Sequence, residues 1–396
     1  MTPAEQQGSG EPPLPESVRL AGATLAEEGP LAGRPLHYGW PADEQEAFQE
    51  GRGLAYLGSV GVVKVSGADR LSWLTTMGSQ IVSDLLPGDS KELLFLDAQG
   101  RIQFAVGVVD DKESAFLLTQ LQFAEALTEF LKSMQFMLRV EVTDLSGGYL
   151  GFASANEDAG FASKNRELAA RLDGLTWQDP WPTVVEGGAA YFQGDHPGAN
   201  FRVYVIPTLA ADLFARDFKA AGDVKLVGLL AANAERVATW RPLPSSEVDE
   251  RALPAELDWL RTAVHLDKGC YAGQESVARI INLGRPPRRL TFLQLDGSGE
   301  GLPEPGTAIL LNGRQVGVLT SVANHFEMGP IGLGLVKRSL DPDAQLTIGG
   351  VDALQELIVP VDGRSDASPK SRPGAGLKRL DLSKQDIRTR GPGTQR

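Results

Sequence analysis

The sequence predicts an α+β protein that ends in a small β-barrel. Between residues 60 and 240, short apolar runs with the alternation of strands are interspersed with apolar stripes at helical spacing. The strands come in pairs and not in strict alternation with helices, which favours an α+β sheet over a regular parallel one. After Pro286-Pro287 the elements are nearly all short strands between Gly and Pro turns, a pattern typical of a barrel of about 70 residues.

The first part of the body is expected to mix strands and helices. A strand over 60–65 precedes a short helix, and we expect the side chain of Asp69 to cap its first turn. Strands over 93–97 and 102–109 follow, and the second shows a clean alternation of apolar and polar residues. A longer helix and a strand over 140–142 come next; the apolar face of that helix consists of Phe123, Leu127, Phe130, Leu131 and Met134.

The second part continues in the same way up to the barrel. A strand is expected over 201–205, and Gly222 ends the helix that follows it. In the barrel, Asn312-Gly313 is a strong signal for a hairpin turn between strands over 309–311 and 316–318. The remaining expected elements are a helix with Leu209, Leu213, Phe214 and Phe218, a helix with Leu229, Leu230, Asn233 and Val237, and barrel strands over 290–295 and 331–335.

These elements divide the chain into four segments. Residues 1–29 are expected to be a disordered lead-in, and the body extends over 30–285, with a break between two subdomains near 145–200. The barrel is expected over 286–362. Residues 363–396 are rich in Ser, Pro, Gly and basic residues, and we expect a disordered basic tail there.

Charge is distributed unevenly along the chain. The tail holds nine Lys or Arg and three Asp, a net charge of +6, so the other 362 residues carry −19 of the total −13. A body this acidic does not favour contact with phosphate backbones, and we expect it to bind no nucleic acid directly. The tail over 363–396 could touch RNA or an acidic partner, although such tails are more often simply solvated.

The chain has one cysteine, which excludes an intramolecular disulfide and a four-thiolate metal site built by one chain alone. The first residues have neither the basic nor the apolar region of a secretory signal, and no apolar run is long enough to span a membrane. We therefore expect a cytoplasmic protein without membrane contacts or a resident metal.

The cysteine lies in a run that points to chemistry, Lys268-Gly269-Cys270-Tyr271-Ala272-Gly273-Gln274-Glu275. Val277, Ile280 and Ile281 then recur at helical spacing, which places Cys270 just before a helix N-terminus. Unpaired backbone N–H groups and a nearby lysine favour a thiolate there. A lone cysteine is usually a small buried apolar residue, but polar residues crowd this one, so we expect an accessible thiol.

This run, followed by Val277-Ala278-Arg279, resembles the signature of the YgfZ-type folate-binding proteins. Those proteins are relatives of the glycine-cleavage T protein, an aminomethyltransferase. The resemblance extends from about residue 30 to about residue 362, and its other landmarks are His37-Tyr38-Gly39 and the runs 67–71, 100–102, 253–256 and 329–338.

The resemblance implies a T-protein-like, folate-binding body with a central channel for tetrahydrofolate, plus the C-terminal barrel. It also implies an accessory role in assembling or repairing iron–sulfur proteins, especially of the four-iron type, with an indirect effect on tRNA modification. The expected partners are iron–sulfur client or assembly proteins. Cys270 would be the functional thiol and a possible ligand of a transient cluster shared with a partner; the expected folate-binding residues are Arg236, Lys268, Gly269, Tyr271, Gly273, Gln274 and Glu275.

Two departures from the family pattern leave alternatives open. The T protein has an acidic pair after its glycine turn, whereas Gly100 is followed by no such pair, which argues against aminomethyl transfer and against a classical enzyme. Asp97, before this turn, is expected to bond nearby backbone N–H groups. Trp240 occupies a position where the family usually has Gly. The alternatives are a tetrahydrofolate-dependent aminomethyl or methyl transferase and a noncatalytic scaffold braced by folate.

Two residues near the cysteine could form local pairs. An ion pair between Lys268 and Glu275 would fix the loop, although an exposed pair contributes only about 0–1 kcal/mol. A pair of Cys270 with His265 would suggest a thiol hydrolase, but five residues of spacing do not establish contact.

Overall fold

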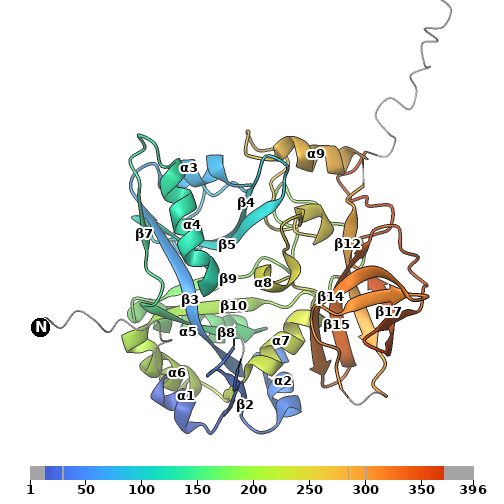
Figure 1. Cartoon of the computed structure of the whole chain (residues 1–396). Helices are drawn as coiled ribbons and strands as arrows, with labels where there is room; N and C mark the ends of the chain where they lie inside the picture. The colour runs from blue at the N-terminus through green and yellow to red at the C-terminus, as the bar shows by residue number, and fades with distance from the viewer. Residues whose placement is uncertain (1–13, 29–30, 284, 299–300, 370–396) are drawn as a thin grey trace, which may run out of the picture.

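The computed structural model describes residues 14–28, 31–283, 285–298 and 301–369. A large sheet and its covering helices form one side of the molecule, and a closed barrel forms the other (Figure 1). A central segment that contains α8 (Pro244–Glu247) lies between them in this view. The predicted α+β fold with a C-terminal barrel is confirmed.

One long strand, β3 (Gly53–Ser66), joins the two halves of the sheet. Its second half pairs with β6 (Ser114–Gln120) and β7 (Glu141–Asp144). Its first half pairs with β8 (Tyr149–Ala155) and, in parallel, with β11 (Lys225–Val227). The predicted strand over 60–65 is therefore correct but covers less than half of β3. The main path of the sheet runs through β4 (Ser90–Leu96), β5 (Ile102–Asp110), β6, β3, β8, β10 (Phe201–Pro207) and β9 (Leu175–Gln178), and β7 and β11 pair with β3 off this path.

The first half of the sheet carries the predicted hairpin. β4 (Ser90–Leu96) and β5 (Ile102–Asp110) pair antiparallel, with Leu96 opposite Ile102. α3 (Arg70–Met77) and α4 (Leu121–Met134) pack beside them around one apolar core. The buried residues of that core include Trp73, Leu74, Phe95, Leu127 and Leu131.

Asp69 does not cap α3 with its side chain, so that expectation is wrong. Its carboxylate accepts hydrogen bonds from the backbone N–H of Arg139 at 3.0 Å and from Nε of the same residue at 3.1 Å. A guanidinium competes well for a carboxylate because the bond between two charged groups is stronger than a bond to a neutral N–H. Asp69 therefore links the start of α3 to the strand that follows α4.

The second half of the sheet consists of β8, β10 (Phe201–Pro207) and β9 (Leu175–Gln178). α5 (Ala159–Arg171) and α6 (Ala211–Ala220) cover it, and Phe214 and Phe218 of α6 are fully buried as expected. Leu209 is fully exposed, because it precedes the helix on a one-turn 3₁₀ segment, η1 (Thr208–Ala210).

Part of the expected lead-in is packed. α1 (Glu16–Leu20) contacts α6, and its Val18 is fully buried. The backbone N–H of Ser17 donates to the carboxylate of Asp212 at 2.6 Å. Residues 14–28 thus differ from the expected disorder because one apolar side chain and one helix-start N–H find partners on α6, while residues 1–13 lie outside the described part.

The central elements tie the sheet to the barrel. α2 (Pro41–Gln49) packs on α7 (Leu229–Ala238), and α7 in turn contacts the barrel strand β14 (Arg314–His325). The predicted helix with Val237 on its buried side is α7, although its Leu230 is 43% exposed. The remaining short elements are β1 (Thr24–Leu25), β2 (Pro35–His37), η2 (Pro254–Glu256) and α9 (Gln274–Leu283).

The barrel closes through six strands in the order β12-β15-β14-β13-β16-β17. The hairpin turn is at Asn312-Gly313, where both residues have positive φ, 50° and 76°, as a type I′ turn requires. Leu290 and Phe292 belong to the largest core cluster together with Trp259 of the body, so the barrel packs its outer face onto the body. The strands other than β14 are β12 (Arg288–Leu295), β13 (Ala308–Leu311), β15 (Gly329–Lys337), β16 (Leu346–Ile348) and β17 (Val351–Leu357).

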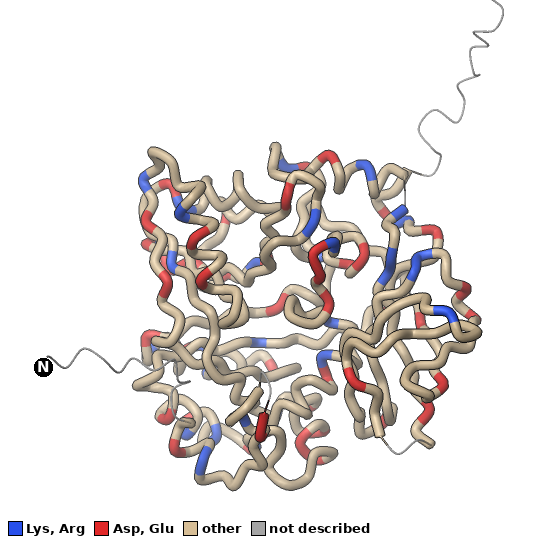
Figure 2. Tube along the Cα trace, viewed as in Figure 1, with Lys and Arg blue, Asp and Glu red and all other residues tan. Residues whose placement is uncertain are grey.

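The chain beyond the barrel returns to the body. The backbone N–H of Asp366 donates to the carbonyl oxygen of Ala190 at 3.0 Å, and Ser368 Oγ donates to the carbonyl oxygen of Ile281 at 2.9 Å. The first residues of the expected tail therefore lie against α9, and the rest, from residue 370, lies outside the described part. Acidic and basic residues are interspersed along the tube in Figure 2, and none of the described helices is long and apolar enough to cross a bilayer.

Candidate functional site

Cys270 is exposed and lies on a short loop that ends where α9 begins at Gln274. Val277 and Ile281 anchor this helix on its buried side. The loop places the thiol in contact with solvent immediately before the helix, as the sequence predicts. The structure can therefore present Cys270 to a partner without unfolding.

Lys268 anchors the cysteine loop to the end of α3. Its ammonium group donates to the carbonyl oxygens of Thr75 and Gly78, at the end of α3, at 2.5 and 2.6 Å. The Tyr271 ring lies 4.7 Å from the same nitrogen, a cation–π contact. Burial lowers the pKa of Lys268 to about 8. The ammonium group is directed to these three partners, and the expected ion pair with Glu275 does not form.

The other residues of the motif close the loop. Gln274 Nε2 donates to the carbonyl oxygen of Lys268 at 3.2 Å. Tyr271 packs against the largest core cluster, and burial raises its pKa to about 12. Gly269 has open space around it, and Glu275 is exposed at the start of α9. The motif is thus a braced loop on which Cys270 and Glu275 face outward.

Gly273 and Gly100 lie back to back. Gly273 has φ of 79°, and a Cβ there would meet the carbonyl oxygen of Asp97 at 2.5 Å and the Cα of Gly100 at 2.6 Å. Gly100 also has positive φ, 78°, and a Cβ there would meet that of Ser276 at 2.9 Å. Only glycine fits this backbone approach at both positions. The cysteine loop therefore rests directly on the turn between β4 and β5.

Asp97 holds that turn, as predicted. Its carboxylate accepts the backbone N–H groups of Gln99 and Arg101 at 2.9 and 2.8 Å. This pattern is an Asx-type turn, in which an aspartate side chain replaces backbone partners. Oδ1 of Asp97 accepts both of these bonds and so stabilises the turn.

Arg236 lies elsewhere, at the junction of α7, α8 and the barrel. Its guanidinium donates to Asn233 Oδ1, to the carbonyl oxygen of Arg241 at 2.9 Å and to Ser321 Oγ at 2.7 Å. Nη1 also lies 3.4 Å from Glu247 Oε2. All five N–H donors are used within the protein. These contacts place Arg236 at the junction, and its expected contact with folate stays a prediction.

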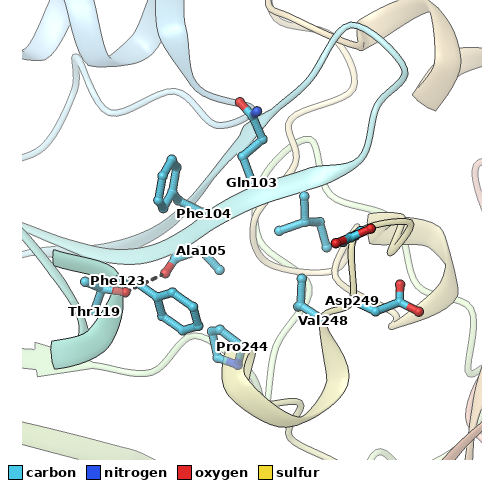
Figure 3. Close-up of a pocket in the computed structure, with 10 residues that line it drawn as sticks. Gln103, Phe104, Ala105, Thr119, Phe123, Pro244, Val248 and Asp249 are labelled. Carbon is cyan, nitrogen blue, oxygen red and sulfur yellow. Dashed lines mark hydrogen bonds between the residues drawn. The ribbon is translucent and has the colours of Figure 1, made fainter. Parts of the chain in front are cut away.

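A pocket of about 210 Å³ opens between β5, α4 and the segment around α8 (Figure 3). Phe123 supplies an apolar wall, and Figure 3 shows its ring directed toward Pro244 and Val248. The ring of Phe104 points away from them and packs against Phe130. The volume lies below the range of about 300–1,000 Å³ that drug-sized ligands fill, so it suits one ring system of a larger molecule. The lining residues are Ile102, Gln103, Phe104, Ala105, Thr119, Phe123, Pro244, Val248, Asp249 and Glu250.

The polar edge of this pocket carries two carboxylates. Arg288 holds Asp249 with two hydrogen bonds, at 2.6 and 2.9 Å, and these bonds keep the pKa of Asp249 below its usual range. Glu250 is exposed and has no hydrogen-bond or ion-pair partner among the described residues. Sequence reasoning missed both, because it looked for acids after Gly100 and not on a loop far along the chain.

A buried ionic cluster lies beneath the central segment. Arg241 donates to Glu92 at 2.5 Å and to Asp179 at 2.7 Å, and Trp259 Nε1 also donates to Glu92, at 2.9 Å. The guanidinium lies 4.9 Å from the ring centre of Trp181. Burial raises the pKa of Asp179 to about 6, although Arg241 opposes the rise. These residues connect β4 to the central segment, and sequence reasoning did not identify them.

His265 does not pair with Cys270. Its Nδ1 accepts the backbone N–H of Asp267 at 3.2 Å, and its ring covers Gly187. Among the residues that the structure describes, no three His, Cys, Asp or Glu side chains converge as metal ligands. The thiol-hydrolase alternative therefore has no geometric basis in the described loop.

The fold and the site together define an α+β protein with a C-terminal barrel, an exposed thiol loop and a small pocket. The solved structure of the glycine-cleavage aminomethyltransferase T from Bartonella henselae superimposes with a TM-score of 0.70. It is 17% identical in sequence, and the match covers 89% of this chain and 98% of that one. The chain thus has the aminomethyltransferase fold.

The sequence relatives agree with this fold. A candidate transferase of Arabidopsis thaliana chloroplasts is 24% identical, over 82% of this chain and 73% of its own. An aminomethyltransferase of Streptomyces avermitilis is 25% identical, over 80% and 87%. The tRNA-modifying protein YgfZ of Escherichia coli is 24% identical, over 71% and 84%. No family model matches the chain. The relatives support the T-protein-like superfamily and do not separate the YgfZ-type branch from the aminomethyltransferases.

Proposed function

We propose that this protein is a folate-binding accessory factor for the assembly or repair of iron–sulfur proteins, especially of the four-iron type. It acts through Cys270 and affects tRNA modification indirectly, through the proteins that it serves. The observation that carries this proposal is the placement of Cys270, which is exposed on a loop braced by Lys268 and Gln274. A braced, exposed thiol can donate one ligand to a cluster whose other ligands a partner supplies.

The pocket beside β5 is the proposed site for tetrahydrofolate. The aminopyrimidinone edge of a pterin presents two parallel N–H donors, which a carboxylate accepts through both of its oxygens. Glu250 is the pocket carboxylate without a partner among the described residues, and Phe123 offers an apolar face to the ring. Since the pocket measures about 210 Å³, the glutamate tail of the folate would extend outside it.

A second candidate function is a tetrahydrofolate-dependent aminomethyl or methyl transferase. The observation that favours it is the pair of carboxylates on the pocket edge, Asp249 and Glu250. The Arg288 pairing keeps Asp249 ionised, and Glu250 could exchange a proton with a bound amine. This candidate predicts that the purified protein converts tetrahydrofolate to its methylene form with an aminomethyl donor.

Calorimetry with tetrahydrofolate tests the binding step. We expect micromolar affinity for the unmodified protein and for Cys270→Ser, because the thiol does not line the pocket. Glu250→Gln should bind about tenfold more weakly, since the amide cannot accept both donors. Glu113→Gln, an exposed carboxylate in the β5–β6 hairpin, is the matched control. Equal affinity for Glu250→Gln and Glu113→Gln would remove Glu250 from the site.

The cellular step is tested separately. Cys270→Ser should lower the activity of four-iron enzymes in cells that contain no other copy of the protein, while the variant accumulates to normal levels. Normal activity of those enzymes at normal protein levels would contradict a role for the thiol and would leave the scaffold alternative.

A further inference from the structure

We infer that the turn between β4 and β5 couples the pocket to the cysteine loop, so that a pterin-class ligand in the pocket orders the loop that carries Cys270. This inference rests on the proposed function, because it assigns a regulatory link between the proposed folate site and the proposed thiol. Gly100 and Gly273 act here as positioning residues for Cys270.

The backbone of the β4–β5 turn lies in close contact with the backbone of the cysteine loop. The positions where Cβ atoms would lie at Gly273 and Gly100 are within 3 Å of the Asp97 carbonyl oxygen and of the Ser276 Cβ. Backbone in such contact cannot move on one side without displacing the other, because packed interiors transmit strain. A shift of the turn therefore becomes a shift of residues 273–276.

The pocket reaches the same turn from its other end. Ile102 lines the pocket, and it follows Gly100 by two residues, roughly 7 Å of extended strand. Its backbone N–H donates to the carbonyl oxygen of Ala252 at 2.9 Å, next to the segment that supplies Asp249 and Glu250. A ligand held between β5 and Glu250 would therefore restrain both the start of β5 and the segment 249–252 that is hydrogen-bonded to it.

The loop moves as one unit because it is tied within itself. Gln274 bonds to the carbonyl oxygen of Lys268, and Lys268 is fastened to the end of α3. The backbone N–H groups of Ser276 and Val277 both donate to the carbonyl oxygen of Gly273, at 3.0 and 3.1 Å. Gly273 is thus the point at which the turn, the loop and the first turn of α9 meet.

Amide hydrogen exchange of the full chain, with and without tetrahydrofolate, tests the coupling. We expect saturating ligand to slow exchange over 102–105 and 249–252, and also, by about threefold or more, over 273–277. In Gly273→Ala the added methyl separates loop from turn, so the protection of 273–277 should disappear while protection over 102–105 remains. Gly269→Ala is the matched control, since its Cβ meets nothing within 4 Å and its φ is not positive.

The outcomes separate the two ideas. Protection over 102–105 without any change over 273–277 in the unmodified protein would overturn the coupling and leave the proposed function standing. No protection anywhere, together with no calorimetric binding, would overturn the folate site itself. Because Cys270 is the single cysteine, its rate of alkylation gives a second readout: a ligand effect on this rate in the unmodified protein, lost in Gly273→Ala and kept in Gly269→Ala, is expected. Gly100→Ala tests the contact from the other side and should match Gly273→Ala.

Discussion

The ammonium group of Lys268 donates a hydrogen bond of 2.6 Å to the carbonyl oxygen of Gly78, the residue that follows α3. The last carbonyls of a helix have no partner within the helix and carry partial negative charge. The Lys268 ammonium group supplies both a hydrogen-bond donor and a positive charge at this helix end. The cysteine loop is therefore fastened to the end of a helix that precedes it by 190 residues in the sequence.

Lys268→Met should release the loop. The variant leaves the carbonyl oxygens of Thr75 and Gly78 without this donor, so we expect a loss of about 2 kcal/mol in the free energy of unfolding. Alkylation of Cys270 should become faster, because the loop loses its hydrogen bonds to the end of α3. Urea unfolding and the rate of iodoacetamide labelling measure the two effects. Arg279→Met, on the exposed side of α9, is the control, and equal labelling rates in the two variants would contradict the anchoring role.

Arg236→Met should destabilise the junction between body and barrel. The substitution leaves Glu247 buried with one partner fewer, and losing one member of a buried ion pair costs about 3–5 kcal/mol. Thermal unfolding measures the loss, and Arg216→Met, which removes an exposed pair with Asp217, should change stability by less than about 1 kcal/mol. An Arg236→Met protein with unchanged stability but weakened tetrahydrofolate binding would restore the original expectation of a folate contact.

Glu92→Ala should also be strongly destabilising, for a different contact. Glu92 accepts hydrogen bonds from Arg241, Trp259 and Thr262, and its loss leaves three buried donors short of an acceptor. We expect a loss of about 3–5 kcal/mol or more. Asp84→Ala provides the comparison, because Asp84 pairs with Lys91, the neighbour of Glu92, at a position where its side chain is 60% exposed. Similar unfolding midpoints for the two variants would show that the cluster contributes little.

Glu235 should make stability depend on pH. Burial raises its pKa to about 7, whereas the unfolded carboxyl titrates near its ordinary value. The folded state holds this proton more tightly, so the stabilisation is complete below the unfolded pKa and is lost as the pH rises toward 7. The loss amounts to about 3 kcal/mol at most.

Glu235→Gln removes this titration. Its free energy of unfolding should fall less steeply than that of the unmodified protein between about pH 5 and about pH 8, and the difference between the two curves isolates Glu235 from other buried acids. Urea unfolding across that range measures both curves. Parallel curves would mean that the carboxyl is already ionised in the folded protein at pH 5. Glu46→Gln, on the exposed side of α2, controls for the change of charge.

Local sequence signals predicted the parts of the fold that depend on local chemistry. Asn312-Gly313 specifies its own turn, the alternation over 102–109 specifies a strand, and Asp97 stabilises a turn through neighbouring N–H groups. The exposed position of Cys270 before α9 also followed from its polar neighbours and from the helical spacing after it.

Other elements were missed because distant residues stabilise them. α2 is mostly polar, and its Glu44 is buried because it accepts the backbone N–H groups of Tyr38 and Gly228. β8 carries small residues such as Ala153 and Ala155, whose burial leaves little periodic signal.

The candidate site also has one part that local sequence predicts and one part that it does not. The residues of the cysteine motif are neighbours in sequence and stay together in space, whereas the pocket joins β5 to a loop near residue 250. Arg236 was expected to contact folate because it matches a position of the family pattern, and sequence alone does not give the partners of its guanidinium. In the structure these partners include Ser321 and Asn233.

The long strand β3 can complete its pairing only late in synthesis. β3 leaves the ribosome early, yet the partner of its first residues, β11, is not made until residue 227. Until then the apolar strand keeps an open edge, which can pair with other chains. Fragments that end before residue 225 should therefore aggregate where the full chain does not.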